Sequence, residues 1–290
     1  MMENILEIRG LTKSYPGFCL DSLSFSIPSG SIVGFIGENG AGKTTVMKLI
    51  LHALERDSGE ILVFGKDNLR FEKEIKQDIG VVQDECNLPR MFSAADIQTV
   101  MKRIYRNWDK EKYFSLLEKF SLPRDKAVSA YSRGMKLKLS YAVALAHGSK
   151  LLLLDEATDG LDPAARDEVL DMLLDFVQDD KHSVLFSTHM TNDLAKIADY
   201  IAFLHQGRLL FFKSKDELIY NYGLLHCGEK LFRQLDSGDI LAWRRLDYEY
   251  QVLTADCRAV AEKHRGCLID HANLDDIMLI YIGGETECRG

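Results

Sequence analysis

The strongest constraint on the fold of this chain is a glycine-rich segment set between an apolar run and a helical pattern. The segment reads Gly37-Glu38-Asn39-Gly40-Ala41-Gly42-Lys43-Thr44, and it lies between the apolar residues 31–36 and the helical stretch 45–51. Glycines let successive backbone N–H groups turn inward around phosphate oxygens, because no Cβ stands in the way. The N-terminus of the following helix adds free donors and a partial positive charge. This order of strand, loop and helix predicts a binding site for a nucleoside triphosphate.

Two side chains at the end of the loop carry the chemistry that such a site needs. Lys43 supplies a point charge for the outer phosphates, and the hydroxyl of Thr44 is suited to ligate Mg²⁺. We therefore expect Mg²⁺ as a cofactor.

A second motif ends in two carboxylates. Four leucines, 151–154, precede Asp155 and Glu156. An apolar run of this kind suits a central strand buried on both faces, and ligands bind at the carboxyl ends of such strands. We predict that Asp155 holds Mg²⁺ and that Glu156 polarises an attacking water molecule. The alternative is a buried strand followed by the acidic start of a helix.

Two further motifs flank the acidic strand. Upstream, Ser132 precedes a helical stretch, where it suits the position of an N-cap. Downstream, His189 ends the apolar run 183–188, one strand and one helix after Glu156. A histidine at a strand end is usually structural, but this one is placed to reach the same phosphate as Glu156.

Taken in order, these motifs resemble the ATP-binding subunit of ABC transporters over residues 3 to about 212. The resemblance implies that the nucleotide is ATP and that residues 37–44 form the Walker A loop. It also implies a Q-loop glutamine at Gln83, a D-loop aspartate at Asp162, a switch histidine at His189 and an adenine-stacking aromatic at Tyr15.

The resemblance assigns three groups of site residues. The expected catalytic residues are Glu156, His189 and Gln83, and the expected metal ligands are Thr44, Gln83 and Asp155. The expected ATP contacts are Tyr15, Gly37, Asn39, Gly40, Gly42, Lys43, Thr44, Thr45, Ser132, Gly134 and Asp162.

The ABC signature departs from the family pattern Leu-Ser-Gly-Gly-Gln. It reads Tyr131-Ser132-Arg133-Gly134-Met135, so the serine and the second glycine are kept. Ser132 offers a hydroxyl and Gly134 an unobstructed N–H at a helix N-terminus that favours anions. The departure affects how tightly the site closes on ATP, and it leaves the family assignment intact.

Composition restricts the possible partners. The 290 residues carry a formal net charge of −8, which argues against a protein that binds the backbone of nucleic acid. No apolar run approaches the ~18 residues that a membrane-spanning helix needs, and the start of the chain does not resemble a signal peptide. The resemblance to ABC transporter subunits implies a protein at the cytoplasmic face of the membrane, held there by a membrane-spanning permease, with a second ATPase chain as its other partner. The six cysteines have no zinc spacing, so metal binding by the cysteine-rich tail is the less favoured alternative.

The expected fold class is α/β, a P-loop NTPase of ABC type with a parallel core sheet, an antiparallel β layer and a helical subdomain. The short alternating runs from Ile5 to Phe35 are typical of the antiparallel layer. We expect the ATP-binding domain at 1–216, with its helical subdomain at about 90–147, and a small α+β domain at 217–290. In that second domain, 225–235 suit a helix, 248–253 a strand, and Asn273 the cap of a final helix. An apolar stripe on this helix, Ile277 and 279–282, either packs on its own core or mediates association.

Two classes of function fit the motifs. One is a transport ATPase working as a pair beneath a membrane dimer, and the other is a soluble ABC-type ATPase acting on nucleic acid or ribosomes. The chain has neither the coiled-coil insertion of chromosome-maintenance members nor the two cassettes of translation members, which favours transport. Within transport, the chain resembles ABC-2-like exporters of antimicrobial or amphipathic peptides, of the bacitracin-resistance and phenol-soluble-modulin types. We expect two chains to close head to tail on ATP, and residues 84–92 to receive a cytoplasmic helix of the permease.

Overall fold

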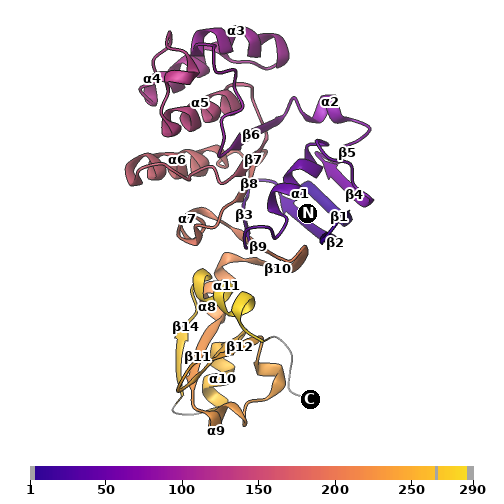
Figure 1. Ribbon diagram of the computed structural model, residues 1–290, viewed down its shortest axis with the longest axis vertical. Coiled ribbons are helices and arrows are strands. Elements are labelled where there is room, and N and C mark those ends of the chain that lie inside the picture. Colours follow the sequence, from indigo (N-terminus) through magenta and orange to yellow (C-terminus); the bar gives the residue numbers. More distant parts are fainter. Residues whose placement is uncertain (1–3, 265–266, 286–290) are drawn as a thin grey trace. The chain divides into compact units, whose positions relative to one another are not determined.

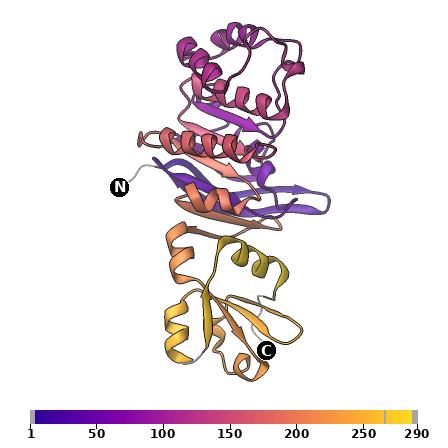
Figure 2. The ribbon, with the colours of Figure 1, turned by 90° about the vertical axis from the view of Figure 1, so that its left-hand side faces the viewer.

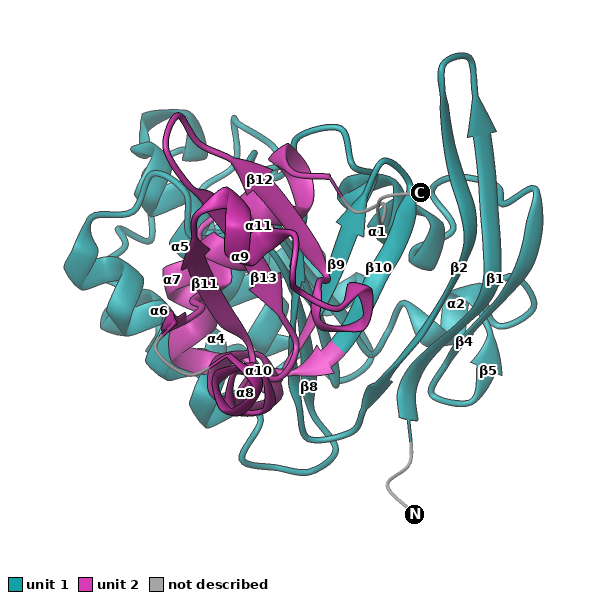
Figure 3. Cartoon of the chain, turned by 90° about the horizontal axis from the view of Figure 1, so that it is seen from below, with its two compact units in different colours: residues 1–189, 202–212 teal, residues 190–201, 213–290 magenta. Residues whose placement is uncertain are grey.

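The computed structural model describes residues 4–264 and 267–285, and the chain divides into two compact units (Figure 3). The first unit holds residues 1–189 and 202–212, and the second holds 190–201 and 213–290. The second unit thus includes the segment that directly follows the switch histidine. The expected boundary near residue 216 stays an interpretation of the sequence.

An antiparallel sheet forms one layer of the first unit (Figure 1). Its strands, in spatial order, are β2 (Phe18–Pro28), β1 (Asn4–Tyr15), β4 (Ser58–Val63) and β5 (Lys66–Asp67). Leu6, Ile8 and Leu11 of β1 are fully buried, whereas Arg9 between them is exposed. One face of this sheet therefore packs on the core and the other faces solvent, as the alternating pattern predicts.

The central sheet of the first unit positions the side chains of the sequence motifs. Its strands, in spatial order, are β10 (Arg208–Ser214), β9 (Tyr200–His205), β3 (Ile32–Ile36), β8 (Ser183–Ser187), β7 (Leu151–Asp155) and β6 (Ile79–Gln83). The pairs β3–β8, β8–β7 and β7–β6 are parallel. Every residue of β3 is buried, so this strand belongs to the central sheet and not to the antiparallel layer that the alternation suggested.

Helices complete the first unit (Figures 1 and 2). They are α1 (Lys43–Ile50), α2 (Glu72–Ile75), α3 (Ala94–Ile104), α4 (Lys110–Lys119), the 3₁₀ turn η1 (Val128–Ala130), α5 (Arg133–Ala146) and α6 (Pro163–Phe176). Side chains at the starts of four of them accept backbone N–H bonds, namely Ser93, Asp109, Ser132 and Asp162. In Figure 1, α3, α4 and α5 gather at one end of the unit and form the expected helical subdomain.

The second unit has its own sheet and core. Its elements are α7 (Thr191–Ile197), α8 (Lys215–Asn221), β11 (Gly223–Cys227), α9 (Glu229–Phe232), η2 (Ser237–Asp239), β12 (Ala242–Arg245), β13 (Tyr250–Thr254), α10 (Cys257–Lys263), β14 (Leu268–His271) and α11 (Leu274–Gly283). The strands pair antiparallel in the order β12-β13-β11-β14. The core brings together Leu225, Cys227, Phe232, Tyr250, Val252 and Val260. These observations confirm a small α+β unit.

One expectation for the second unit is wrong. Residues 225–227 end strand β11, and the helix α9 begins only at Glu229. Leu225 and Cys227 point into the core, and the strand pairs with β13 on one side and β14 on the other. Burial between two neighbouring strands therefore outweighs the helical pattern of this stretch.

The described residues contain neither a membrane-spanning helix nor a metal cluster. No helix within 4–264 and 267–285 is long and apolar enough to cross a membrane. In the same residues no three side chains of histidine, cysteine, aspartate or glutamate gather into a metal cluster. Five cysteines of the described part carry free thiols, and Cys288 lies outside it.

Candidate nucleotide-binding site

The glycine-rich loop lies between the end of β3 and the first residue of α1, as expected. Gly37 and Gly42 have positive φ angles of 156° and 112°. A Cβ on Gly37 would lie 2.2 Å from the carbonyl oxygen of Leu204, and a Cβ on Gly42 would lie 2.8 Å from the ring of Phe18. The loop needs glycine at both positions for its backbone conformation and for its close approach to neighbouring residues.

Lys43 lies inside this loop. Its ammonium group donates hydrogen bonds to the carbonyl oxygens of Gly37, at 2.7 Å, and Glu38, at 3.2 Å. Burial lowers the pKa of Lys43, whereas the charges of Glu156, Asp155 and Glu38 act to raise it. The ammonium group is thus held at the glycine-rich loop, beside three carboxylates.

The three predicted metal ligands come to one edge of the central sheet. The hydroxyl of Thr44 donates a hydrogen bond to Asp155 Oδ2 at 2.7 Å. Gln83 is the register partner of Asp155 between β6 and β7, and its side-chain oxygen accepts a bond from Asn87 at 2.6 Å. A hydroxyl, a carboxylate and an amide oxygen are hard donors of the type that Mg²⁺ prefers, so this set fits the ion.

Glu156 and His189 meet at the ends of adjacent strands. Their closest atoms, His189 Nδ1 and Glu156 Oε2, are 2.7 Å apart. The backbone N–H of Glu156 donates to the carbonyl oxygen of Ser187 at 2.9 Å, which fixes Glu156 to the end of β8. Glu156 also has a φ of 51°, a conformation that costs free energy in a non-glycine residue and that is concentrated at functional sites. The predicted base and the switch histidine are therefore neighbours.

Two cavities border the glycine-rich loop. The smaller, of about 250 Å³, is lined by residues that include Lys43, Thr44, Thr45, Asp155 and Glu156. Its lining also includes Asn39, Gly40, Gly42, Glu38 and Phe18. This cavity gathers most of the predicted phosphate and metal contacts in one place.

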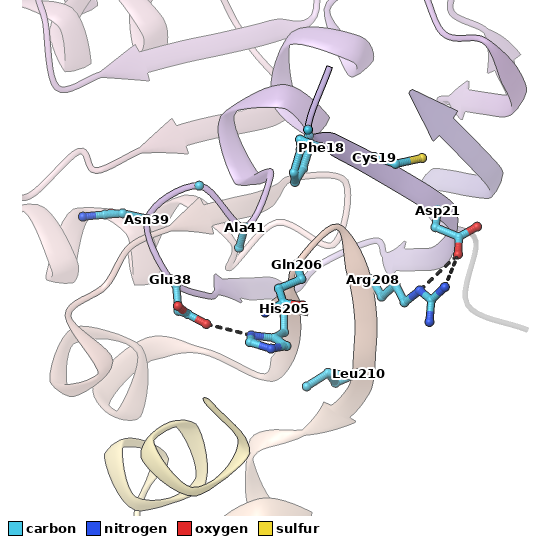
Figure 4. Close-up of a pocket in the computed structure, with 12 residues that line it drawn as sticks. Phe18, Cys19, Asp21, Glu38, Asn39, Ala41, His205, Gln206, Arg208 and Leu210 are labelled. Carbon is cyan, nitrogen blue, oxygen red and sulfur yellow. Dashed lines mark hydrogen bonds and ion pairs between the residues drawn. The ribbon is translucent and has the colours of Figure 1, made fainter. Parts of the chain in front are cut away.

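The larger cavity, of about 650 Å³, lies between the loop and the strands β2, β9 and β10 (Figure 4). Two polar contacts border it, His205 Nδ1 with a carboxylate oxygen of Glu38 at 2.7 Å and the ion pair of Arg208 with Asp21 at 2.9 Å. Neither pair could be predicted from the sequence, because each joins residues that are far apart in the chain.

Phe18 is the aromatic side chain that lines both cavities. Tyr15, the predicted adenine contact, ends β1, lines neither cavity, and has its ring centre 6.4 Å from that of Phe18. The stacking role of Tyr15 stays a prediction. The signal for Phe18 was a second aromatic residue directly after the turn at Pro16 and Gly17.

Comparison with known proteins identifies the family. A family model described as ABC transporter matches residues 20–159. An uncharacterised ABC transporter ATP-binding protein, YhcH of Bacillus subtilis, is 34% identical over 224 residues, which cover 75% of this chain and 73% of that protein. The bacitracin transport ATP-binding protein BcrA of Bacillus licheniformis is 31% identical over 212 residues, covering 72% of this chain and 69% of that protein. The chain belongs to the ATP-binding subunits of ABC transporters.

The fold agrees with this assignment. A solved ATP-binding subunit of an ABC transporter superposes with a TM-score of 0.67 at 24% identity, covering 74% of this chain and 91% of the other. This chain belongs to a family of ATPases that bind ATP. The ATP-binding subunits of ABC transporters act together with membrane permeases. This finding favours transport over a soluble ATPase acting on nucleic acid or ribosomes.

The ABC signature lies apart from both cavities. The Ser132 hydroxyl accepts the backbone N–H of Met135 at 3.2 Å, so Ser132 caps α5 as predicted. Among the described residues that line the two cavities, neither Ser132 nor Gly134 is present. Asp162 caps α6, accepting the N–H of Ala165 at 3.0 Å. The ATP contacts assigned to Ser132, Gly134 and Asp162 stay predictions.

Proposed function

We propose that this chain binds and hydrolyses ATP to power a membrane exporter of amphipathic or antimicrobial peptides. The observation that carries the hydrolytic part is the 2.7 Å contact between Glu156 and His189, beside the loop that holds Lys43. The substrate class is supported by the relative named for bacitracin transport.

The residues of one chain supply most of the chemistry. Lys43 and the backbone N–H groups of the loop bind the outer phosphates of ATP. Thr44, Asp155 and Gln83 would hold Mg²⁺, which when bound neutralises charge on the phosphate oxygens. Glu156 accepts a proton from the attacking water. His189 fixes the carboxylate of Glu156 through the short contact of Nδ1 with Oε2.

The outer side of the terminal phosphate needs donors from a second chain, a further copy or a close paralogue. Ser132 and Gly134 lie at the start of α5, a helix of 14 residues whose N-terminus favours anions. In a head-to-tail pair, each chain places this helix start against the ATP of the other. ATP then joins the two chains, and hydrolysis lets them separate because the charged products repel each other.

A groove beside the Q-loop is the proposed docking surface for the permease. It has a volume of about 200 Å³ and is lined by Val81, Gln83, Glu85, Asn87, Leu88, Ser140 and Val143. Met91, at the end of the same segment, is 89% exposed, so its apolar side chain is accessible to a partner. Gln83 both lines this groove and pairs in register with Asp155, so docking and metal binding share one residue. Docking holds the chain at the cytoplasmic face of the membrane.

The test of the catalytic assignment is Glu156→Gln. Removal of a positioned base lowers turnover by ~10²–10⁴-fold, about 3–5 kcal/mol in the activation barrier. ATP affinity is expected to persist, because the phosphate contacts of Lys43 are unchanged. Glu111→Gln, on the first turn of α4, is the matched control and should behave as the parent. ATP turnover of Glu156→Gln within about threefold of the parent would show that Glu156 is not the base.

A further inference from the structure

Arg133 occupies the signature position where the family pattern has glycine, and its guanidinium group is engaged within its own chain. One nitrogen, Nη2, contacts Asp159 Oδ2 at 2.7 Å and also pairs with a carboxylate oxygen of Asp84. The pKa of Arg133 is raised, first through its hydrogen bond to Asp84 and then through the bond to Asp159. A single side chain therefore joins the Q-loop, the signature and the segment that follows Glu156.

The two residues that carry these carboxylates, Asp84 and Asp159, are each joined by a backbone hydrogen bond to the end of β7 or to the residue after it. The N–H of Asp84 donates to the carbonyl oxygen of Asp155 at 3.0 Å. The N–H of Asp159 donates to the carbonyl oxygen of Glu156 at 3.1 Å. Arg133 is therefore linked through Asp84 to the predicted metal ligand Asp155, and through Asp159 to the predicted base Glu156.

The turn that carries Asp159 is shaped around the arginine. Gly160 has a φ of 76°, a left-handed conformation that favours glycine. A Cβ at this position would lie 3.0 Å from Cδ and 3.1 Å from Cζ of Arg133. The absence of a side chain at Gly160 thus lets the arginine lie against the backbone of the turn, so the contact is part of the local packing.

We propose that Arg133 is a positioning residue that couples the ATP site of its own chain to the signature that it offers to the second chain. The inference rests on the proposed head-to-tail pair, because only there do Ser132 and Gly134 face a nucleotide. Movement of Gln83 or Glu156 on ATP binding passes through Asp84 and Asp159 to the start of α5. The carboxylates also hold the guanidinium within its own chain, away from the nucleotide of the partner.

If Arg133 had only a structural role, its replacement should change the stability of the protein little. Arg133 is 52% exposed, and exposed ion pairs contribute little to stability. Arg9 provides a matched control, because its guanidinium also bridges two carboxylates, Glu7 and Glu60, and is 58% exposed. Arg9 lies on the antiparallel sheet, outside all the ATP motifs.

The first experiment measures ATP hydrolysis by the complex with the permease for Arg133→Gln and Arg9→Gln. We expect Arg133→Gln to lower kcat roughly fivefold, the size of a coupling of about 1 kcal/mol within one network. The KM for ATP should stay within about twofold, the Hill coefficient should fall towards one, and Arg9→Gln should match the parent. Arg133→Lys should recover part of the effect, because an ammonium group keeps the charge but not the fork geometry. An Arg133→Gln complex with the parent kcat and Hill coefficient would overturn the inference.

The second experiment asks whether the three side chains act together. Asp159→Asn and Asp84→Asn should each lower kcat in the same direction as Arg133→Gln, and the double variant Arg133→Gln/Asp159→Asn should be no worse than Arg133→Gln alone. Additive losses, or a rise in KM confined to the arginine variants, would contradict coupling and would assign Arg133 to the nucleotide of the partner.

Glu156→Gln on the same preparation separates the two proposals. If Glu156→Gln hydrolyses ATP like the parent, the proposed catalysis fails, whereas an inactive Glu156→Gln with unaffected Arg133 variants rejects only the coupling.

Discussion

At the scale of single residues, the nucleotide site depends on a cation that is surrounded by acids. Lys43 is buried in the loop, and the charges of Glu156, Asp155 and Glu38 all act on it. The carbonyl oxygens of Gly37 and Glu38 accept hydrogen bonds from its ammonium group. A phosphate that enters this acidic site needs the lysine to offset repulsion from the three carboxylates.

Lys43→Ala should therefore lose most of the affinity for ATP. Isothermal titration calorimetry measures this directly, with Lys48→Ala as a control, since Lys48 is an exposed lysine on the same helix. Lys48→Ala is expected to bind ATP as the parent does. Equal affinity of the parent and Lys43→Ala would reject the assigned role of the loop.

His189→Ala should separate binding from chemistry. The loop and Lys43 are untouched, so ATP should bind with the affinity of the parent. Hydrolysis should slow by roughly 10-fold or more, because Glu156 loses the contact with Nδ1 that orients its carboxylate. Single-turnover measurements with saturating enzyme would detect the change, and a parent-like rate would show that the contact has no catalytic role.

At the scale of elements, helix α11 shows how an apolar stripe is divided between two environments. Asn273 and Asp276 form a capping box at its start. Ile277 and Ile280 are fully buried in the second unit, where the helix packs on β12, β13 and α7, whereas Leu279 is exposed. Two of the five residues of the stripe are therefore buried in its own core, Tyr281 and Ile282 are half-buried, and Leu279 is the strongly exposed large apolar side chain.

Substitutions on α11 should follow this division. Ile277→Ala should lower the free energy of unfolding by about 2–5 kcal/mol, since it removes buried methyl groups and leaves a cavity. Asn273→Ala should cost about 1 kcal/mol through the lost cap. Leu279→Ala is the control and should stay within about 0.5 kcal/mol. Urea unfolding followed by circular dichroism measures all three, and an equal cost for Leu279→Ala and Ile277→Ala would contradict the burial pattern.

At the scale of the whole molecule, one chain carries one phosphate loop and one signature, and the signature lies outside the cavities beside the loop. Under the proposed function, a complete ATP site is formed by two chains, and the membrane path belongs to the permease. The exposed Met91 and the groove at Val81 and Gln83 form the docking surface that we propose for the permease.

The purified chain alone should be largely monomeric, and its ATPase rate should rise more than linearly with concentration. Co-expression with the permease should give a complex of two ATPase and two permease chains that requires detergent for extraction. Amphipathic peptide should stimulate ATP hydrolysis by this complex. A soluble monomer with full activity, indifferent to membranes and to Ser132→Arg, would rule out the proposed transport role.

Met91→Glu should prevent recovery of that complex, because a charge on the docking surface cannot be buried without a partner. Tyr248→Glu is the control, since Tyr248 is an apolar side chain 98% exposed in the second unit. Affinity purification of the tagged permease, followed by quantification of the ATPase chain, measures both. Equal recovery of Met91→Glu and the parent would place the docking surface elsewhere.

The sequence by itself determined the parts of this protein that depend on local chemistry. Glycines 37 and 42 permit a backbone that closes on phosphate, so the loop could be recognised without coordinates. The same holds for the caps Ser132 and Asn273, because each acts on an N–H three residues ahead. The order of strands and helices then followed from apolar runs that only a sheet covered on both faces can bury.

Tertiary structure alone decided which residues meet. Glu156 and His189 are 33 residues apart, and their contact exists because parallel strands β7 and β8 end at the same edge. The bridge from Arg133 to Asp84 and Asp159 depends on how α5 packs, which no pattern within one segment contains. The strand at β11 was likewise set by its two neighbouring strands against the helical pattern of its own residues. The helical propensity of a residue contributes a few tenths of a kcal/mol to the free energy of folding. The burial of a large apolar side chain between distant segments contributes more, about 1.5–3 kcal/mol.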